Sequence, residues 1–205
     1  MVLKSLYVIL SATKDLLEFD LIREIPRLRS DMTESSFLVS NSNIYASGER
    51  FMKIVVLSDI HGLVTYAERI IELEKPDEVI FCGDGLREIQ ESAKFYRKVR
   101  FHFVKGNCDF MGDCFERYIT LGGKNILITH GHRYNVKMEY QMNYITLRSH
   151  ARDLGADLVC FGHTHYPDIC YMDGMILINP GAVNSGKYAV VEIIDGKIEP
   201  ELRSL

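Results

Sequence analysis

Between residues 52 and 104, continuous apolar runs alternate with segments whose apolar positions recur at helical spacing. Short apolar runs bounded by polar or glycine residues are typical of buried strands. In the segments between them, apolar residues such as those at 64, 67, 70 and 71 fall on one helix face. The pattern predicts a β-α-β-α-β order, with strands at 52–58, 78–82 and 99–104 and helices at 63–74 and 86–97.

The pattern changes after residue 117. Gly122-Gly123-Lys124 separates two apolar runs, at 118–121 and 125–129, and predicts a hairpin. A helix at 140–154 and a strand at 158–161 follow. Short apolar runs joined by Asp-Gly turns then predict an antiparallel meander of four strands, at 169–172, 175–178, 188–194 and 197–202. A parallel half followed by a meander half predicts an α/β fold of two sheets packed face to face with helices outside.

The first 51 residues differ from the rest and carry no motif, so we expect an N-terminal extension at 1–51 and one domain at 52–205. The apolar run at 6–10 is too brief to span a membrane. Residues 30–50 are polar and aperiodic, which predicts a mobile segment. Three interpretations of the extension stay open: a translated leader before a natural start at Met52, an amphipathic cap at 15–28, or a cleaved presequence.

Composition adds modest limits. The 205-residue chain is 47% apolar, enough to bury one sizeable core, and its formal charge of −4 gives no pull toward nucleic acid or an anionic membrane. Net charge does not name a partner, but the chain has no apolar run long enough for a membrane and no extended basic and aromatic stripe for nucleic acid, so we expect neither a membrane nor a stable nucleic-acid partner. The five cysteines are odd in number and contain no Cys-x-x-Cys pair, which predicts reduced thiols and a cytoplasmic location.

Residues that can bind metal follow the predicted strands in five clusters. The carboxyl edge of an α/β sheet gathers its ligand sites, so we expect these clusters to meet. Alone, each is weak: an aspartate between glycines is usually a turn residue, an asparagine after glycine a left-handed one, and a lone histidine a surface one. The clusters are Ser58-Asp59-Ile60-His61-Gly62, Gly83-Asp84-Gly85, Gly106-Asn107-Cys108-Asp109, His130-Gly131-His132 and Gly162-His163-Thr164-His165.

Together the clusters hold more candidate ligands than one ion needs. Imidazole and carboxylate suit transition metals such as Mn, Fe, Ni, Zn or Co. Asp84 has a glycine on each side, and its two carboxylate oxygens can bridge ions about 3.5–4 Å apart. The chain is therefore interpreted as a binuclear metallohydrolase.

The ordered set Asp-x-His, Gly-Asp, Gly-Asn, His-Gly-His and Gly-His-Thr-His resembles the calcineurin-like metallophosphoesterases. Residues 106–109 and 130–137 are similar to the small prokaryotic phosphodiesterases of the YfcE type. The resemblance covers essentially all of residues 52–205 and implies a four-layer α/β/β/α sandwich of two mixed sheets.

The resemblance also implies the metal ligands and the reaction. It implies two divalent ions, with Mn as the first choice, that bridge a hydroxide for attack on a small phosphodiester. His132 is a candidate either for a hydrogen bond to phosphate or for orienting a ligand, a role that Asp109 could also take, and Asn107 and Cys108 are further catalytic candidates. One ion would be held by Asp59, His61, Asp84 and His165, and the other by Asp84, Asn107, His130 and His163.

One departure from the family pattern affects the predicted substrate. Many relatives carry a histidine at the position of Cys108, where it is thought to stabilise the transition state or protonate the leaving group. A thiol is a poor substitute, so we predict a preference for esters with acidic leaving groups, such as aryl phosphodiesters.

Two other function classes stay open. The retromer subunit of this fold resembles a phosphoesterase but works by binding protein partners, and its ligand set is eroded, whereas all seven positions are present here. A phosphomonoesterase would use the same ligands. A homo-oligomer is compatible with either class.

Overall fold

The computed structural model describes residues 43–44, 50–139 and 142–205. They belong to a compact unit that runs from Ser42 to Leu205. The predicted extension therefore lies almost wholly outside the described residues, and the three interpretations of it stay predictions. Within its last residues, β1 (Asn43–Ile44) pairs with β2 (Arg50–Leu57), so the first long strand begins before Met52.

The first sheet combines parallel and antiparallel strands. Its main path runs in the order β11-β10-β2-β3-β4, and β1 pairs with β2 off this path. β2, β3 and β4 are parallel to one another, as two β-α-β units require, and β10 pairs antiparallel with β2. The remaining strands are β3 (Glu78–Phe81), β4 (Arg100–Phe103), β10 (Lys187–Ile194) and β11 (Lys197–Ser204).

The second sheet has the order β5-β6-β7-β9-β8, in which β6, β7 and β9 are parallel. Gly122 and Gly123 close the predicted hairpin between β5 and β6, with φ of 56° and 77° that a two-residue turn of this hand requires. The strands are β5 (Glu116–Leu121), β6 (Lys124–Thr129), β7 (Leu158–Cys160), β8 (Asp168–Met172) and β9 (Met175–Asn179).

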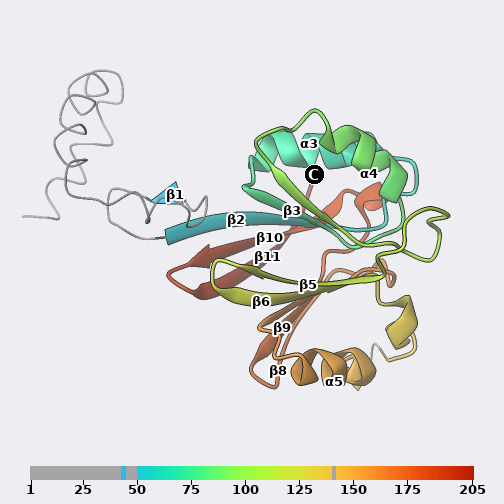
Figure 1. The fold of residues 1–205 in the computed structure, drawn as a ribbon. Coiled ribbons are helices and arrows are strands. Elements are labelled where there is room, and N and C mark those ends of the chain that lie inside the picture. The colour runs from blue at the N-terminus through green and yellow to red at the C-terminus, as the bar shows by residue number, and fades with distance from the viewer. Residues whose placement is uncertain (1–42, 45–49, 140–141) are drawn as a thin grey trace, which may run out of the picture. The chain divides into compact units, whose positions relative to one another are not determined.

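The two sheets pack face to face and helices cover their outer faces, which confirms the predicted α/β sandwich (Figure 1). Alternate residues of β2 divide between two cores: Ile54 and Val56 face the second sheet, and Val55 and Leu57 face the helices. α3 (Val64–Glu74) and α4 (Leu86–Ala93) cover the first sheet, and α5 (Ile145–Asp153) packs with Leu127 and Val159 of the second.

Three details of the predicted fold are wrong. The four last strands form no single meander: β8 and β9 join the second sheet, and β10 and β11 join the first. The helix predicted at 140–154, of which residues 140 and 141 lie outside the described residues, corresponds to α5, which begins at Ile145 because Asn143 and Tyr144 take left-handed φ of 52° and 55°. α4 ends at Ala93, four residues early, and turns follow it.

Among the described residues, no helix is both long and apolar enough to cross a membrane.

Candidate metal centre

The predicted ligands sit on loops directly after strands of both sheets, and strained backbone is common among them. Five of the seven have positive φ although they carry side chains: Asp59, His61, Asp84, His163 and His165, with values between 44° and 70°. This region is sparsely populated by residues other than glycine, and such strain gathers at functional sites. The backbone of these loops therefore adopts a strained conformation at the residues whose side chains form the site.

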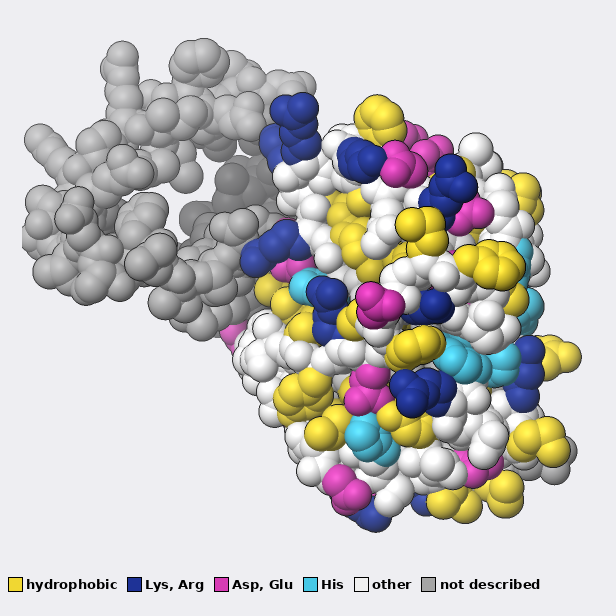
Figure 2. Space-filling view, turned by 45° about the vertical axis from the view of Figure 1, so that its right-hand side comes forward, with side chains coloured by type: hydrophobic (Ala, Val, Ile, Leu, Met, Phe, Trp, Pro, Cys, Tyr) yellow, Lys and Arg dark blue, Asp and Glu magenta, His cyan; other side chains and the backbone are white. Residues whose placement is uncertain are grey.

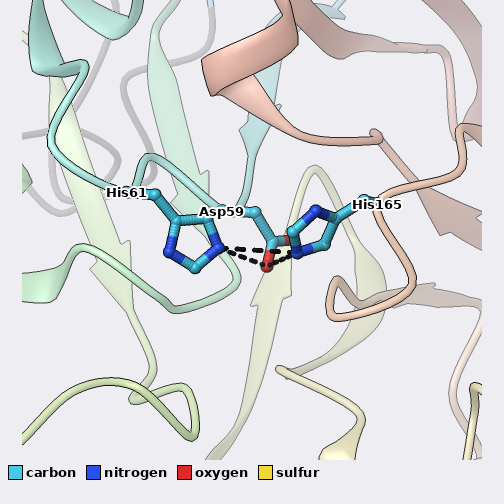
Figure 3. A group of neighbouring side chains, drawn as sticks. All are labelled: Asp59, His61 and His165. Atoms are coloured by element: carbon cyan, nitrogen blue, oxygen red, sulfur yellow. Dashed lines mark hydrogen bonds and ion pairs between the residues drawn. The ribbon is translucent and has the colours of Figure 1, made fainter.

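Asp59, His61 and His165 form the first group (Figure 3). Asp59 Oδ1 lies 3.8 Å from His61 Nε2 and 3.2 Å from His165 Nε2, and the two nitrogens are 3.5 Å apart. Asp59 is fully buried, yet Oδ1 accepts no hydrogen bond from the described residues. A buried carboxylate oxygen without a donor is costly unless a cation meets it, so this group fits a metal ion.

Asp84, Asn107 and His130 form the second group. His130 Nδ1 must donate to the Cys82 carbonyl oxygen, 2.7 Å away, because a carbonyl can only accept. Its Nε2 then faces Asn107 Oδ1 at 3.0 Å and Asp84 Oδ2 at 3.3 Å. In the neutral imidazole these three atoms are all electron-pair donors, which a cation or a proton must hold together.

Asp84 joins the two groups. Its Oδ2 lies 3.9 Å from His61 Nε2 and 3.3 Å from His130 Nε2, while its Oδ1 accepts a hydrogen bond of 2.7 Å from the Cys108 N–H. Burial raises the pKa of Asp84, but His130 and the Cys108 N–H outweigh burial and hold that pKa well below its usual range. Conversely, burial lowers the pKa of His130, and the carboxylates of Asp84 and Asp59 raise it above its usual value.

The remaining predicted histidines border the second group. The His163 ring lies 5.0 Å from that of His130, centroid to centroid. The backbone N–H of His163 donates a hydrogen bond to Asp59 Oδ2 at 3.1 Å. Burial and the charge of His130 lower the pKa of His163 to about 4. The His132 ring is 5.4 Å from that of His130, and its buried Nδ1 has no hydrogen-bond partner among the described residues.

Cys108 lies at the edge of the centre. Its side chain is exposed and accepts a hydrogen bond of 3.2 Å from Asn107 Nδ2. One ligand atom each of Cys108, His61 and Asp84 lies within 4.8 Å of the others. Partial burial and the neighbouring Asp84 raise the pKa of the thiol above its ordinary value.

Asp109 positions the second group through the backbone. Its two oxygens accept hydrogen bonds from four N–H groups, those of Asp84 and Gly85 at 2.9 Å and of Leu86 and Gly106 at 2.8 Å. The loops after β3 and β4 are thereby tied together. The close approach of these two loops also requires glycine at position 106, since a Cβ there would lie 2.0 Å from Asp84 Oδ1.

Asn179, at the end of β9, is a positioning residue that sequence reasoning missed. The fully buried side chain donates from Nδ2 to Gly162 O at 2.8 Å and to Thr164 Oγ1 at 2.9 Å. It thereby holds the loop that carries His163 and His165. A polar residue ending an apolar strand before Pro-Gly was the available signal.

The structure thus gathers all seven predicted ligands at one edge of the two sheets. On the face shown in Figure 2, histidine side chains reach the surface beside exposed hydrophobic and basic ones. The converging nitrogen and oxygen atoms suit a divalent transition metal.

Comparison with known proteins agrees with this arrangement. Residues 52–195 match the model of the Calcineurin-like phosphoesterase superfamily domain. The Bacillus subtilis protein named "Probable metallophosphoesterase YsnB" is 36% identical over 135 residues, which are 64% of this chain and 75% of that protein. Phosphodiesterase YfcE of Escherichia coli K12 is 25% identical over 161 residues, covering 66% of this chain and 82% of YfcE.

Solved structures share the fold. A Streptococcus pneumoniae TIGR4 protein described as a predicted phosphoesterase superposes with a TM-score of 0.62 at 27% identity, over 75% of this chain and 90% of that one. A Vps29 single mutant from Entamoeba histolytica has a TM-score of 0.53 at 21% identity, over 75% of this chain and 99% of that one, a likeness of fold alone. The matched domain and the identity to YsnB together show that this chain belongs to the calcineurin-like phosphoesterase superfamily, a family that implies divalent metal ions.

Proposed function

We propose that this chain is a metal-dependent phosphodiesterase that hydrolyses small phosphodiesters at a two-metal centre. The observation that carries the proposal is the position of Asp84 Oδ2, which faces His61 Nε2 at 3.9 Å on one side and His130 Nε2 at 3.3 Å on the other. A carboxylate that lies between two imidazole-bearing groups can bind two metal ions at the same time. The name of the relative YfcE supports the diester as substrate class.

The proposed ligand sets follow the two groups. Asp59, His61, Asp84 and His165 would hold one ion, and Asp84, Asn107, His130 and His163 would hold the other. When bound, two divalent ions lower the pKa of a coordinated water and bind phosphate oxygens. We take Mn as the first choice, with Ni, Fe, Zn and Co as alternatives that the same donors accept.

The chain's own residues orient this centre. The Cys82 carbonyl fixes the His130 tautomer and leaves Nε2 free for a metal. Asp109 fixes the backbone of Asp84. His132, whose Nδ1 has no partner among the described residues, is the proposed hydrogen-bond donor to a phosphate oxygen.

The test is hydrolysis of bis-p-nitrophenyl phosphate by the full-length chain after metal removal, with and without added Mn²⁺. We expect activity only with metal, and at least a hundredfold loss in Asp84→Ala, because an ion without its ligand binds weakly. Asp113→Ala is the matched control, since Asp113 is exposed. Activity that persists without metal, or in Asp84→Ala, would contradict the proposal.

Two alternative functions give different results in the same assay. A phosphomonoesterase would hydrolyse p-nitrophenyl phosphate in preference to the diester. A scaffold of the kind that the sequence left open would bind Mn²⁺ and hydrolyse neither ester. We place the enzyme in the cytoplasm, in line with the five free thiols.

A further inference from the structure

An open groove adjoins the candidate metal centre on its His61 side. It has a volume of about 750 Å³ and begins at His61, Asp84 and Cys108. From there it runs between α4 and the loop after β4, where Phe110 and Met111 line it. A substituent of a phosphate bound at the centre could enter this groove directly.

The loop that forms one wall is held at two points. On one side Asp109 accepts hydrogen bonds from the N–H groups of Gly85 and Leu86. On the other, Gly112 lies so close to Leu86 that a Cβ would come within 2.8 Å of its Cδ2. Between these points Phe110 is 99% exposed and Met111 is 72% exposed. Two large apolar side chains are thus presented to solvent from an anchored turn, beside the centre.

Exposed apolar groups that line a groove mark a binding surface for an apolar partner. The opposite wall, α4, carries Arg87, Glu88, Gln90 and Glu91, all exposed. Among the described lining residues other than the candidate metal ligands, the one cation, Arg87, is therefore outnumbered by three carboxylates, those of Glu88, Glu91 and Asp109. Glu91 also pairs with Lys94 at 2.5 Å. This balance disfavours a second phosphate or a nucleic-acid backbone. An uncharged group fits better.

We infer that this groove binds an uncharged aromatic ring carried by the phosphoester substrate, with Phe110 as the residue that selects for the ring. The inference rests on the proposed function, since the phosphate has to be held at the metal centre. Aromatic rings pair with phenylalanine through offset or edge contacts, and methionine sulfur packs at ring edges. The Gln90 amide, on the α4 wall, can accept or donate to polar atoms at the ring edge.

The test measures binding, which needs no turnover. The Mn²⁺-loaded full-length chain is titrated with phenylphosphonate and with methylphosphonate by calorimetry. We expect phenylphosphonate to bind about tenfold more tightly, and Phe110→Ala to remove most of this preference without changing the methylphosphonate affinity. Phe110→Trp should retain the preference. Because Phe110 is almost fully exposed, its replacement removes no packing from the folded chain.

Phe95→Ala is the matched control, since Phe95 is 84% exposed but does not line this groove. Equal affinity for both phosphonates, or a preference that survives Phe110→Ala, would overturn the inference while leaving the proposed function intact. If neither phosphonate bound the loaded protein, the proposed function itself would fail, and the groove inference with it.

Discussion

At the scale of single residues, Cys108 separates this chain from the pattern that its sequence resembles. Its thiol lies beside His61 and Asp84, where the resemblance implies a histidine in many relatives. A protonated thiol is a weak acid and a weak hydrogen-bond donor compared with an imidazolium. The residue therefore bears on which leaving groups the proposed enzyme can release.

Replacing Cys108 with histidine should accelerate hydrolysis of dialkyl phosphodiesters by about a hundredfold, because a positioned general acid contributes on this scale. Hydrolysis of bis-p-nitrophenyl phosphate should change little, since p-nitrophenolate leaves without a proton. The measurement is kcat on both esters, with alcohol release followed by NMR. Cys108→Ser is the control, and a histidine variant that gains nothing on the dialkyl ester would count against the assignment.

At the scale of elements, the centre depends on loops held by hydrogen bonds rather than on strands alone. Asp109 ties the loops after β3 and β4 and caps the first turn of α4, the element that also forms one wall of the groove. Both the candidate centre and the groove thus share one anchor.

Asp109→Asn should therefore lower the free energy of unfolding of the metal-free chain by about 2 kcal/mol, because an amide nitrogen replaces an acceptor opposite backbone N–H groups. Urea unfolding followed by circular dichroism measures this, with metal removed so that ion binding adds nothing. The exposed Asp113, changed to Asn in the same loop, should have an effect within about 0.5 kcal/mol. Equal stability of the two variants would refute the anchoring role.

The elements also show which parts of the fold the sequence pattern could predict and which it could not. The strands were predictable because short apolar runs end at polar residues or glycine. Sheet membership was not, because β8–β9 and β10–β11 are both local hairpins. Their sheets are decided by distant pairings, of β9 with β7 and of β10 with β2. The late start of α5 was missed because left-handed Asn143 and Tyr144 interrupt an otherwise helical pattern.

The clustering of the candidate ligands was more predictable than the sheets, since these residues carry their chemistry in type and spacing. Asp59, Asp84 and His130 are metal-binding types that follow strands, so the topology brings them to one edge and the hydrogen bonds of the loops position them. The role of Asn179 was not predicted, because its side chain hydrogen-bonds a loop distant in sequence, at Gly162 and Thr164, and no local pattern encodes such a contact. The groove was not predicted, because its shape depends on the path of the loop after β4, which the sequence pattern does not determine.

At the scale of the whole molecule, a partly buried ionic network around the buried carboxylate of Glu74 joins α3 to the first sheet. Glu74 accepts hydrogen bonds from Tyr188 Oη and Arg203 Nη1, both at 2.8 Å, and pairs with Lys53 Nζ at 2.6 Å. Burial raises the pKa of Glu74, but these three partners outweigh burial and bring the pKa below its ordinary 4.5. The folded state therefore favours the ionised carboxylate.

Since the folded pKa is the lower one, this stabilisation is present above pH 4.5 and is lost as pH falls through the folded pKa. Glu74→Gln should cost about 2 kcal/mol at pH 7, because Lys53 and Arg203 regain only part of their hydration, and the cost should shrink below pH 4.5. Urea midpoints at pH 7 and pH 4 test this. Glu199→Gln, on exposed β11 surface, is the control, and a cost independent of pH would refute the network's role.

The central claim is that two ions share the carboxylate of Asp84. The most direct test is the stoichiometry of Mn²⁺ binding to the metal-free full-length chain, counted by calorimetry and by electron paramagnetic resonance, beside Asp84→Ala. We predict two ions per chain with spin coupling between them, and the loss of that coupling together with at least one ion in the variant. A single ion in the parent chain, or two uncoupled ions that Asp84→Ala leaves in place, would contradict the account.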